Sequence, residues 1–428
     1  MQQWVDGRQE RAGYFRDQAW VETMEGGFMK GATPRGVAID SAAHRLTYAD
    51  LDADALGLRG QVDRGGVLPL RTDDAAVVAA ALITLDGWAR AVHLLPAGVD
   101  IDVPVSAAGH QAVDAVGTHW VLYTSGTTGA PTPVSHTLAS LDRTVVRGTG
   151  LASAPVWGLL YDPNRMAGIQ VILQSMMSGA RLVAPTLSRP LHERVGTLVA
   201  GGVDALSATP TLWRRILQLP NSTELTLRQI TLGGEIADQP VLDALRHRYP
   251  SARIVHVFAS TETGAAFSVR DGRAGFPVSY LAEPPRGIAL EIRDGILHVH
   301  SPGASVAGPD GFASTGDIVE VVGDRVMFRG RASGVVNVGG TNVWPEEVEQ
   351  LLRSHPAVSD AVVSSTPNPL AGNLLVARIV AAPDAERAGL GKALRAFVRE
   401  HAPSTHVPAT VKVVDELETS AAGKVVRA

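Results

Sequence analysis

The feature that most constrains this fold is the alternation of short buried-strand patterns with helical patterns along most of the chain. Apolar runs over Ala205–Thr209, Ile230–Gly233 and Arg253–Phe258 each end in small or polar residues. Such alternation is typical of α/β proteins, whose ligands bind outside the carboxyl ends of the strands. We therefore predict an α/β fold in which several strand ends contribute to one shared site.

The N-terminal third contains further elements of both kinds. The sequence predicts helices over Leu46–Gly57 and Ala75–Asp86, and buried strands over Ala91–Leu95 and His119–Thr124. Thr47 is placed to cap the first of these helices, since its hydroxyl can accept a hydrogen bond from the first turn.

The pattern changes after about residue 285, where short strands separated by turn residues follow. These strands are predicted over residues 289–293, 296–300, 318–322 and 325–328. Pro345–Leu352 reads as a helix, with proline in its first turn and acidic residues near its positive dipole end. Strands are predicted beyond it at 361–365, 375–380 and 410–414, and a helix at 391–401. Because Gly330–Gly340 is glycine-rich, we predict a domain of residues 1–330 followed by a small α+β domain of residues 331–428.

Composition excludes several classes of function. None of the 428 residues is cysteine, so disulfides, zinc–thiolate sites and thiol catalysis by the protein are ruled out. The formal net charge of −5 and an aromatic content of 5% argue against a nucleic-acid partner. The longest mostly apolar stretch, Ala75–Leu85, is too short to span a membrane. The polar start of the chain does not resemble a signal peptide, so we expect a cytoplasmic protein without a membrane partner.

The segment Tyr123–Pro131 (YTSGTTGAP) carries the strongest chemical signal. It follows a predicted strand and contains two hydroxyl–hydroxyl–glycine units. Glycine lets the backbone approach a ligand, and turned N–H groups form a concavity suited to phosphate. The segment is not a Walker A loop, because no Gly-Lys-Ser/Thr follows. Taken alone, its composition also fits a flexible linker.

Three further segments have both a chemical and a structural interpretation. In Ser260–Gly264, Glu262 is suited to Mg²⁺, although this segment taken alone favours a carboxylate at a helix N-terminus. In Ser314–Asp317, the carboxylate of Asp317 in a glycine turn can accept both hydroxyls of a ribose, although such turns also occur in hairpins. In Thr419–Arg427, Lys424 near the terminus is either catalytic or merely solvated.

Taken together and in this order, these motifs resemble those of the adenylate-forming superfamily. That group contains acyl- and aryl-CoA ligases, adenylation domains of nonribosomal peptide synthetases, and firefly-type luciferases. The Phe-Arg-Gly-Arg segment ending at Arg331, the helix start Pro345–Glu349 and the early Leu46–Leu51 element (LTYADL) belong to the same pattern. The resemblance implies a large N-terminal domain of stacked α/β subdomains plus a small β-barrel-like part, followed by a small mobile α+β C-terminal domain.

The resemblance also implies the chemistry and the cofactors. Members use ATP and Mg²⁺ to convert a carboxylic acid into an acyl-adenylate with release of pyrophosphate, and a thiol of coenzyme A or phosphopantetheine then takes the acyl group. The β- and γ-phosphates would be held by Thr124, Ser125, Gly126, Thr127, Thr128 and Gly129. Thr261 would contact the α-phosphate and Glu262 would hold Mg²⁺. Lys424 matches the catalytic lysine that bridges the carboxylate and the α-phosphate.

Other positions correspond to the nucleoside, thiol and acyl sites of the family. Gly233, Gly234 and Glu235 resemble the segment lining the adenine and acyl pockets; Asp317 would bind the ribose hydroxyls, and Arg331 would orient the sugar. Gly339 and Gly340 resemble the loop that reaches the thiol tunnel when the C-terminal domain rotates. The implied acyl pocket comprises Tyr161, Asp162, Arg165, Gly168, Ser207, Thr209, Gly233, His256 and Ala259. Asp162 either binds a substrate amine or caps the following helix with Pro163 in its first turn, and His256 alone reads better as a hydrogen-bonded core residue.

Three departures from the family pattern stand out. Thr132 occupies the position of a usual lysine after the phosphate loop, Ser333 falls near the usual hinge residue, and Gly60–Leu95 is compressed. A charge-assisted contact contributes about 1.5–3 kcal/mol, so losing the lysine should slow turnover without abolishing it.

The predicted function is ATP-dependent activation of an aryl or medium-chain acid, followed by transfer to a thiol. Coenzyme A is favoured as acceptor because no carrier domain is fused to the chain, and a carrier protein is the close alternative. Transfer to an amine or to nitrite is a more remote possibility. An alternative of another class is a nucleotide-binding protein with weakened catalysis, against which Glu262, Asp317, Arg331 and Lys424 argue together.

Overall fold

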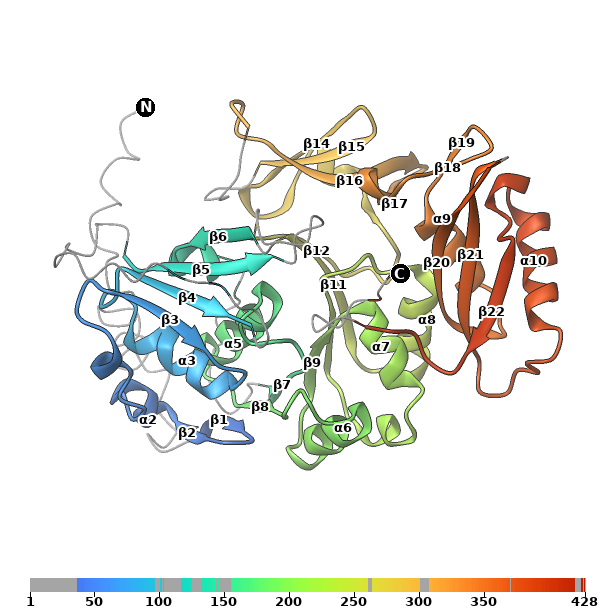
Figure 1. Cartoon of the computed structure of the whole chain (residues 1–428). Helices are drawn as coiled ribbons and strands as arrows, with labels where there is room; N and C mark the ends of the chain where they lie inside the picture. Colours follow the sequence, from blue (N-terminus) through green and yellow to red (C-terminus); the bar gives the residue numbers. More distant parts are fainter. Residues whose placement is uncertain are drawn as a thin grey trace.

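Four β-sheets and the helices that pack on them make up the described part of the chain. The computed structural model describes residues 37–96, 101, 103, 117–124, 132–143, 145, 155–260, 264–300, 308–369, 371–419, 425 and 427. Three of the sheets belong to the larger N-terminal domain, and the fourth belongs to the C-terminal domain, drawn in red in Figure 1.

The largest sheet has six parallel strands and an antiparallel strand at each edge, in the order β12-β11-β10-β9-β7-β8-β1-β2. Because the inner strands are parallel, their carboxyl ends meet at one edge of the sheet, as predicted. The strands are β1 (Val37–Ser41), β2 (Arg45–Thr47), β7 (Trp157–Leu159), β8 (Leu182–Ala184), β9 (Ala205–Ala208), β10 (Gln229–Leu232), β11 (Arg253–Ser260) and β12 (Gly264–Val269).

Helices cover both faces of this sheet. Leu182 and Ala184 of β8 join one apolar cluster that includes two long helices, whereas Val183 between them joins another cluster that includes three helices. This two-residue period is that of a strand buried on both faces. The first pair of helices is α3 (Ala75–Thr84) and α5 (Met166–Met177), and the other three are α6 (Leu191–Ala200), α7 (Pro210–Leu217) and α8 (Gln239–Arg248).

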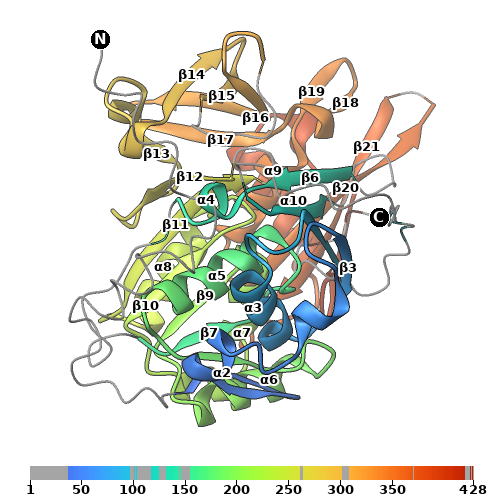
Figure 2. The ribbon, with the colours of Figure 1, turned by 90° about the vertical axis from the view of Figure 1, so that its left-hand side faces the viewer.

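A second sheet lies across α3 from the first. Its order is β3-β4-β5-β6, with parallel β3, β4 and β5. α3 packs beside α5, and its apolar cluster contains residues from both sheets, so the two sheets stack with these helices between them (Figure 2). The elements are β3 (Val67–Arg71), β4 (Ala91–Leu95), β5 (His119–Thr124) and β6 (Thr132–His136), with α2 (Tyr48–Asp52) and α4 (Leu138–Leu141) nearby in the chain.

The third sheet is antiparallel and forms the small β part of the N-terminal domain, in the order β13-β17-β16-β15-β14. Its apolar side, which includes Phe276, packs on Phe267 of β12, and this contact joins it to the edge of the main sheet. The strands are β13 (Phe276–Pro277), β14 (Ala289–Arg293), β15 (Ile296–His300), β16 (Ala313–Val322) and β17 (Arg325–Arg331).

The C-terminal domain is a separate α+β unit with its own apolar core. Its sheet has the order β19-β18-β21-β20, and β22 pairs with β21. The domain contacts the larger one through α9 against β17 and through β20 against α7. Its elements are β18 (Val336–Val338), β19 (Thr341–Val343), α9 (Pro345–Arg353), β20 (Val358–Asn368), β21 (Gly372–Ala381), α10 (Leu390–His401) and β22 (Thr410–Val414).

The first predicted helix is shorter than expected. Thr47 caps α2 in a reciprocal capping box with Asp50, as predicted, but the helix ends at Asp52 instead of extending to Gly57. Asp54 has a left-handed backbone, and its carboxylate accepts hydrogen bonds from the N–H groups of Leu58 and Arg59. These local bonds compete with helix continuation and start a short 3₁₀ turn instead.

Candidate active site

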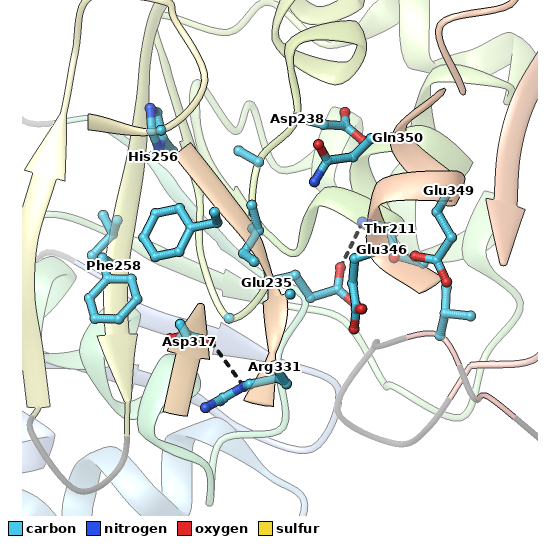
Figure 3. A pocket seen from close by; sticks show the side chains of 18 of the residues that line it. Thr211, Glu235, Asp238, His256, Phe258, Asp317, Arg331, Glu346, Glu349 and Gln350 are labelled. Atoms are coloured by element: carbon cyan, nitrogen blue, oxygen red, sulfur yellow. Dashed lines mark hydrogen bonds and ion pairs between the residues drawn. The ribbon is translucent and has the colours of Figure 1, made fainter. Parts of the chain in front are cut away.

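A cavity of about 270 Å³ lies where the main sheet, the small β sheet and the C-terminal domain meet. Its walls come from the segment after β10, from β11, from β16 and β17, from α9, and from Val425 and Arg427 near the end of the chain. Figure 3 shows Phe258 and His256 of β11 on one side of the cavity and Glu346 and Glu349 of α9 on the other.

The segment after β10 is held by the helix that follows the neighbouring strand. Thr209 caps α7 by accepting a hydrogen bond from the N–H of Leu212, which fixes the start of that helix. The N–H of Thr211 in its first turn donates to Oε2 of Glu235 at 3.0 Å (Figure 3). Gly234 has φ +81°, a left-handed conformation that glycine adopts without strain. The predicted nucleoside residues Gly234 and Glu235 therefore line the cavity in a defined conformation.

Asp317 and Arg331 face one another from β16 and β17. They are paired in the register of the two strands, and Nε of Arg331 lies 3.1 Å from Oδ1 of Asp317 (Figure 3). Arg331 also donates to the carbonyl of Thr315. The side chain of Asp317 is 9% exposed, whereas that of Arg331 is 56% exposed. The Ser314–Asp317 segment therefore lies within strand β16 and is not a hairpin turn.

His256 and Phe258 form the β11 wall of the cavity. Phe258 stacks on Phe267 and on Phe328, with ring centroids 5.2 and 5.4 Å apart. Nε2 of His256 is 3.1 Å from the carbonyl of Arg273, so this nitrogen carries the proton. Burial lowers the pKa of His256, against the opposing effect of that carbonyl, and the imidazole is neutral at neutral pH. His256 thus has the internal partner expected of a core histidine, and it also lines the cavity, as does Ala259.

Two of the other predicted acyl-pocket residues, Ser207 and Gly233, lie beside Tyr161. The Tyr161 hydroxyl donates to the carbonyl of Gly233 at 3.3 Å, and it also bonds to Ser207. Burial raises the pKa of Tyr161, so the phenol is neutral. Gly233 directly precedes the cavity-lining Gly234, so this cluster lies at the nucleoside end of the same strand edge.

The interpretation of Asp162 as a helix cap is wrong. α5 begins at Met166, and the residue at its N-cap position is Arg165, without a side-chain capping bond. Asp162 instead accepts a hydrogen bond from the N–H of Asn164 at 2.9 Å, a local turn that delays the helix. Arg165 lies 3.8 Å from Asp162 and donates to the carbonyl of Tyr123 at 2.7 Å. The two charges therefore face each other, at the end of the strand that leads into the predicted phosphate loop.

Gly168 has a steric reason to be glycine. A Cβ atom at this position would lie 2.1 Å from the carbonyl oxygen of Asp162 and 2.9 Å from Cα of Pro163. The first turn of α5 therefore packs directly on the backbone of the preceding segment.

Gly339 and Gly340 form the tip of the β18–β19 hairpin. Both have positive φ angles, +58° and +86°, as a two-residue hairpin turn requires. A Cβ atom at either glycine would meet nothing within 4 Å, and neither glycine lines the cavity. The structure does not bring this predicted thiol-site loop to the nucleoside residues.

The remaining predicted residues lie outside the described part of the chain: Ser125, Gly126, Thr127, Thr128, Gly129, Thr261, Glu262 and Lys424. The backbone of Thr124 ends β5 and pairs with Thr132 at the start of β6. The intervening loop thus joins two strands of one sheet and is not a linker between domains. Near the end of the chain, Val425 lines the cavity, and it follows Lys424 directly in the sequence.

The structure adds to the cavity several charged residues that the sequence analysis did not assign to the site. Asp238, Glu346, Glu349 and Arg353 line the cavity together with Arg427. Burial raises the pKa of Glu346, with Arg427 opposing the effect. The acidic start of the 345–353 helix was recognised, but its partners lie too far away in the sequence to be inferred from local patterns.

The described residues contain no group of three or more histidine or acidic side chains placed to hold a metal ion. Mg²⁺ at nucleotide sites is usually bound by one or two carboxylates together with substrate phosphates and water. A single carboxylate such as Glu262, acting with the phosphates of ATP, suits this mode of binding.

Comparison with known proteins identifies the family. Residues 16–295 match the family model described as AMP-binding enzyme, and residues 347–424 match the one described as AMP-binding enzyme C-terminal domain. The first model alone covers more than half of the chain. The chain therefore belongs to the AMP-binding enzyme family, the adenylate-forming enzymes.

Individual relatives agree with this assignment. A 2-succinylbenzoate–CoA ligase of Geobacillus kaustophilus is 27% identical over 376 residues, which cover 80% of this chain and 74% of that protein. The fatty acid–acyl-carrier-protein ligase MmaC of Mycobacterium marinum is 25% identical over 378 residues, covering 77% and 70%. The crystal structure of the anthranilate CoA ligase AuaEII with anthranoyl-AMP has a TM-score of 0.76 at 18% identity over 95% of both chains, which shows the shared fold.

The family makes the protein an enzyme of the acid–thiol ligase class, whose members depend on ATP. The fold is the predicted one, with a large α/β domain followed by a smaller α+β domain. None of the helices in the described ranges has the length and apolar character needed to cross a bilayer.

Proposed function

We propose that this enzyme uses ATP and Mg²⁺ to convert an aryl or medium-chain carboxylic acid into an acyl-adenylate, and then transfers the acyl group to a thiol. The observation that carries the proposal is the convergence of four separate chain segments on one cavity. These are Gly234–Glu235, the β11 strand end at Ala259, the Asp317–Arg331 pair, and the end of the chain at Val425 and Arg427.

The Asp317–Arg331 pair and two further motifs are assigned parts in the first half-reaction. The carboxylate of Asp317 accepts hydrogen bonds from the ribose hydroxyls, and Arg331 fixes the orientation of that carboxylate. The loop at Ser125–Gly129 is proposed to bind the leaving phosphates. Glu262 would hold Mg²⁺, which supplies charge neutralisation when bound to the phosphates.

The bond changes follow from this arrangement. A carboxylate oxygen of the acid attacks the α-phosphorus, and the bond from that phosphorus to the bridging oxygen breaks, so pyrophosphate leaves. Because two anions must approach, a positive charge between them lowers the barrier. Lys424 supplies this charge, and the position of its neighbour Val425 in the cavity wall supports the assignment. In the second step the thiol sulfur attacks the acyl carbon, the acyl–oxygen bond breaks, and AMP leaves.

The acid is proposed to bind beside Tyr161, Ser207 and Gly233. The hydroxyl groups of Tyr161 and Ser207 already have hydrogen-bond partners within the protein, so this part of the pocket presents neutral surfaces. Asp162 and Arg165 pair with one another, so together they add no net charge to this region. The relative and the structural neighbour named for 2-succinylbenzoate and for anthranilate support an aryl acid.

Coenzyme A is the proposed acceptor, in line with the named CoA ligases. A carrier-protein thiol is the second candidate, since MmaC is named as an acyl-carrier-protein ligase. We propose that residues 331–428 form the domain that moves between the two half-reactions. β17 ends at Arg331, and the separate sheet of this domain begins at Val336, which supports that boundary. The thiol-site loop at Gly339–Gly340 would then reach the cavity only after such a movement.

The decisive experiment is acid-dependent exchange of pyrophosphate into ATP, measured over a panel of aryl, amino-aryl, fatty and amino acids. Lys424→Ala should abolish the exchange, whereas Lys412→Ala should leave it intact, because Lys412 is an exposed residue of β22. Exchange that persists in Lys424→Ala would refute the role of that lysine. ATP binding without exchange for any acid would favour a nucleotide-binding protein. Supplying coenzyme A or a phosphopantetheinylated carrier protein then identifies the acceptor.

A further inference from the structure

A chain of buried charges crosses the contact between the two domains. Arg214 of α7 lies 2.6 Å from Asp238, and Arg353 of α9 lies 3.2 Å from the same carboxylate oxygen. Arg353 also pairs with Glu349 at 3.3 Å, and Glu349 pairs with Arg427 at 2.9 Å. The first four side chains are between 3% and 11% exposed, and only Arg427 is substantially exposed, at 42%. We call these five residues the charge chain.

Asp238 is the member of the charge chain that joins the cavity segment after β10 to the domain contact. It lies in the wall of the cavity, at the end of the segment that begins with Gly234 and Glu235. Its Oδ1 accepts a hydrogen bond from the N–H of Val241 and so caps α8, while Oδ2 faces the two arginines. One of those arginines comes from the large domain and the other from the C-terminal domain. The C-terminal domain therefore touches the cavity wall through a charged contact.

The energetics of this contact depend on both arginines. Burial of Asp238 by itself would raise its pKa, but Arg214 and Arg353 outweigh this effect, so the pKa of Asp238 is lowered. Removing Arg353 while the domain stays docked would leave the buried carboxylate neither hydrated nor fully neutralised. Withdrawal of Arg353 together with its domain leaves Asp238 with Arg214 alone, so the segment that carries Asp238 loses one of its contacts.

We propose that Asp238 is a positioning residue that couples docking of the C-terminal domain to the conformation of the nucleotide cavity. With the domain docked, Arg353 holds Asp238 and, through it, the cavity segment 234–238. A nucleotide that orders this segment in turn favours the docked domain, since coupling between two equilibria is reciprocal. The inference rests on the proposed function for one point, that the cavity ligand is ATP.

Asp238→Asn isolates this coupling. The amide keeps an oxygen to cap α8 and has nearly the same shape, but it removes the negative charge that faces the arginines. Asp204→Asn is a matched control, because Asp204 also uses one oxygen for a backbone N–H, that of Val156, and the other for an arginine, Arg228. Asp204 does not line the cavity, and its arginine lies in the same domain.

The experiment measures ATP affinity and amide hydrogen exchange of α9, both without acid so that no reaction occurs. In the wild type and in Asp204→Asn, ATP should slow exchange in residues 345–353. In Asp238→Asn this protection should disappear, and ATP affinity should fall about 5- to 50-fold, within the usual range of coupling between sites. A purely structural role would lower thermal stability but leave the ATP-induced protection of α9 in place.

Two results would overturn the proposal: full ATP-induced protection of α9 in Asp238→Asn, or an equal loss of affinity in Asp204→Asn. Should Asp238→Asn fail to fold, Arg353→Lys serves instead. The lysine keeps the positive charge but lacks the planar group that contacts Asp238 and Asp360 together. The proposed function is tested separately: absence of acid-dependent exchange in the wild type would refute the ligase reaction, yet leave ATP-linked docking measurable.

Discussion

Replacing Asp317 by asparagine should weaken ATP use far more than it weakens the fold. The Asp317 side chain is largely buried, whereas its partner Arg331 is 56% exposed, so the ion pair is screened by water and contributes about 0–1 kcal/mol to stability. A hydrogen bond from a ribose hydroxyl to the carboxylate is charge-assisted and worth about 1.5–3 kcal/mol. Loss of one such bond corresponds to about a 10- to 150-fold rise in KM for ATP.

The assay is acid-dependent exchange as a function of nucleotide concentration, with ATP, 2′-deoxy-ATP and 3′-deoxy-ATP. The wild type should discriminate against the deoxynucleotides, and Asp317→Asn should lose most of that discrimination, because the missing hydroxyl and the missing charge belong to one interaction. Asp324→Asn is the control, since Asp324 lies between the same two strands but is exposed and pairs with Arg273. The assignment fails if both variants have the same KM for ATP, or if Asp317→Asn still discriminates fully.

Three further predictions concern packing, the second half-reaction and pH. Gly168→Ala should destabilise the protein by about 1–3 kcal/mol, because the new Cβ would overlap the carbonyl of Asp162. Gly196→Ala, in the interior of α6 where the new Cβ has space, should instead stabilise the protein by up to about 1 kcal/mol. Urea unfolding measures both changes, and equal effects of the two substitutions would contradict the packing argument. Gly340→Trp should block thioester formation while sparing pyrophosphate release, with Gly340→Ala reporting the cost of its positive φ alone; equal loss of both half-reactions in Gly340→Trp would count against it. Because the pKa of Asp238 is lowered in the folded protein, its ion pairs stabilise the fold at pH values above the ordinary pKa of 3.8, and this stabilisation is lost as the pH falls through the folded-state pKa. Below about pH 5, the free energy of unfolding should therefore decrease more steeply with falling pH for the wild type than for Asp238→Asn. The same pH dependence in both proteins would contradict this.

Local patterns were sufficient to predict most strands but not every helix boundary. The predicted strands Ala91–Leu95 and Thr410–Val414 have the observed bounds, because apolar runs between turn residues leave few other possibilities. The start of α5 was missed for a local reason as well. One of the two interpretations of Asp162 made it the cap of this helix, but the carboxylate closes a turn with Asn164 and the helix begins at Met166. An aspartate favours both a helix cap and a local turn, and the packing around it decides which of the two forms.

The cavity was predictable to the extent that its residues follow strand ends. Gly234 and Glu235 come directly after β10, and the register of two adjacent strands brings Asp317 to Arg331. The contact between Asp238 and Arg353 joins residues 115 positions apart in the sequence, in different domains. No local sequence pattern specifies which of many arginines pairs with a given carboxylate, so the contact between Asp238 and Arg353 could not be predicted from the sequence.

The use of charges at the domain contact has a physical consequence for a reaction in two steps. An apolar contact of the same size would be costly to open, because separation exposes apolar surface to water at about 25 cal/mol per Å². Separating ion pairs instead exchanges their mutual attraction for hydration, and these two terms nearly cancel. The charge chain from Arg214 to Arg427 is thus suited to define one docked orientation while leaving the domain able to undock. If the C-terminal domain moves between the half-reactions, as proposed, the contact between the domains must define one docked orientation. It must also allow the C-terminal domain to undock at little net cost in free energy.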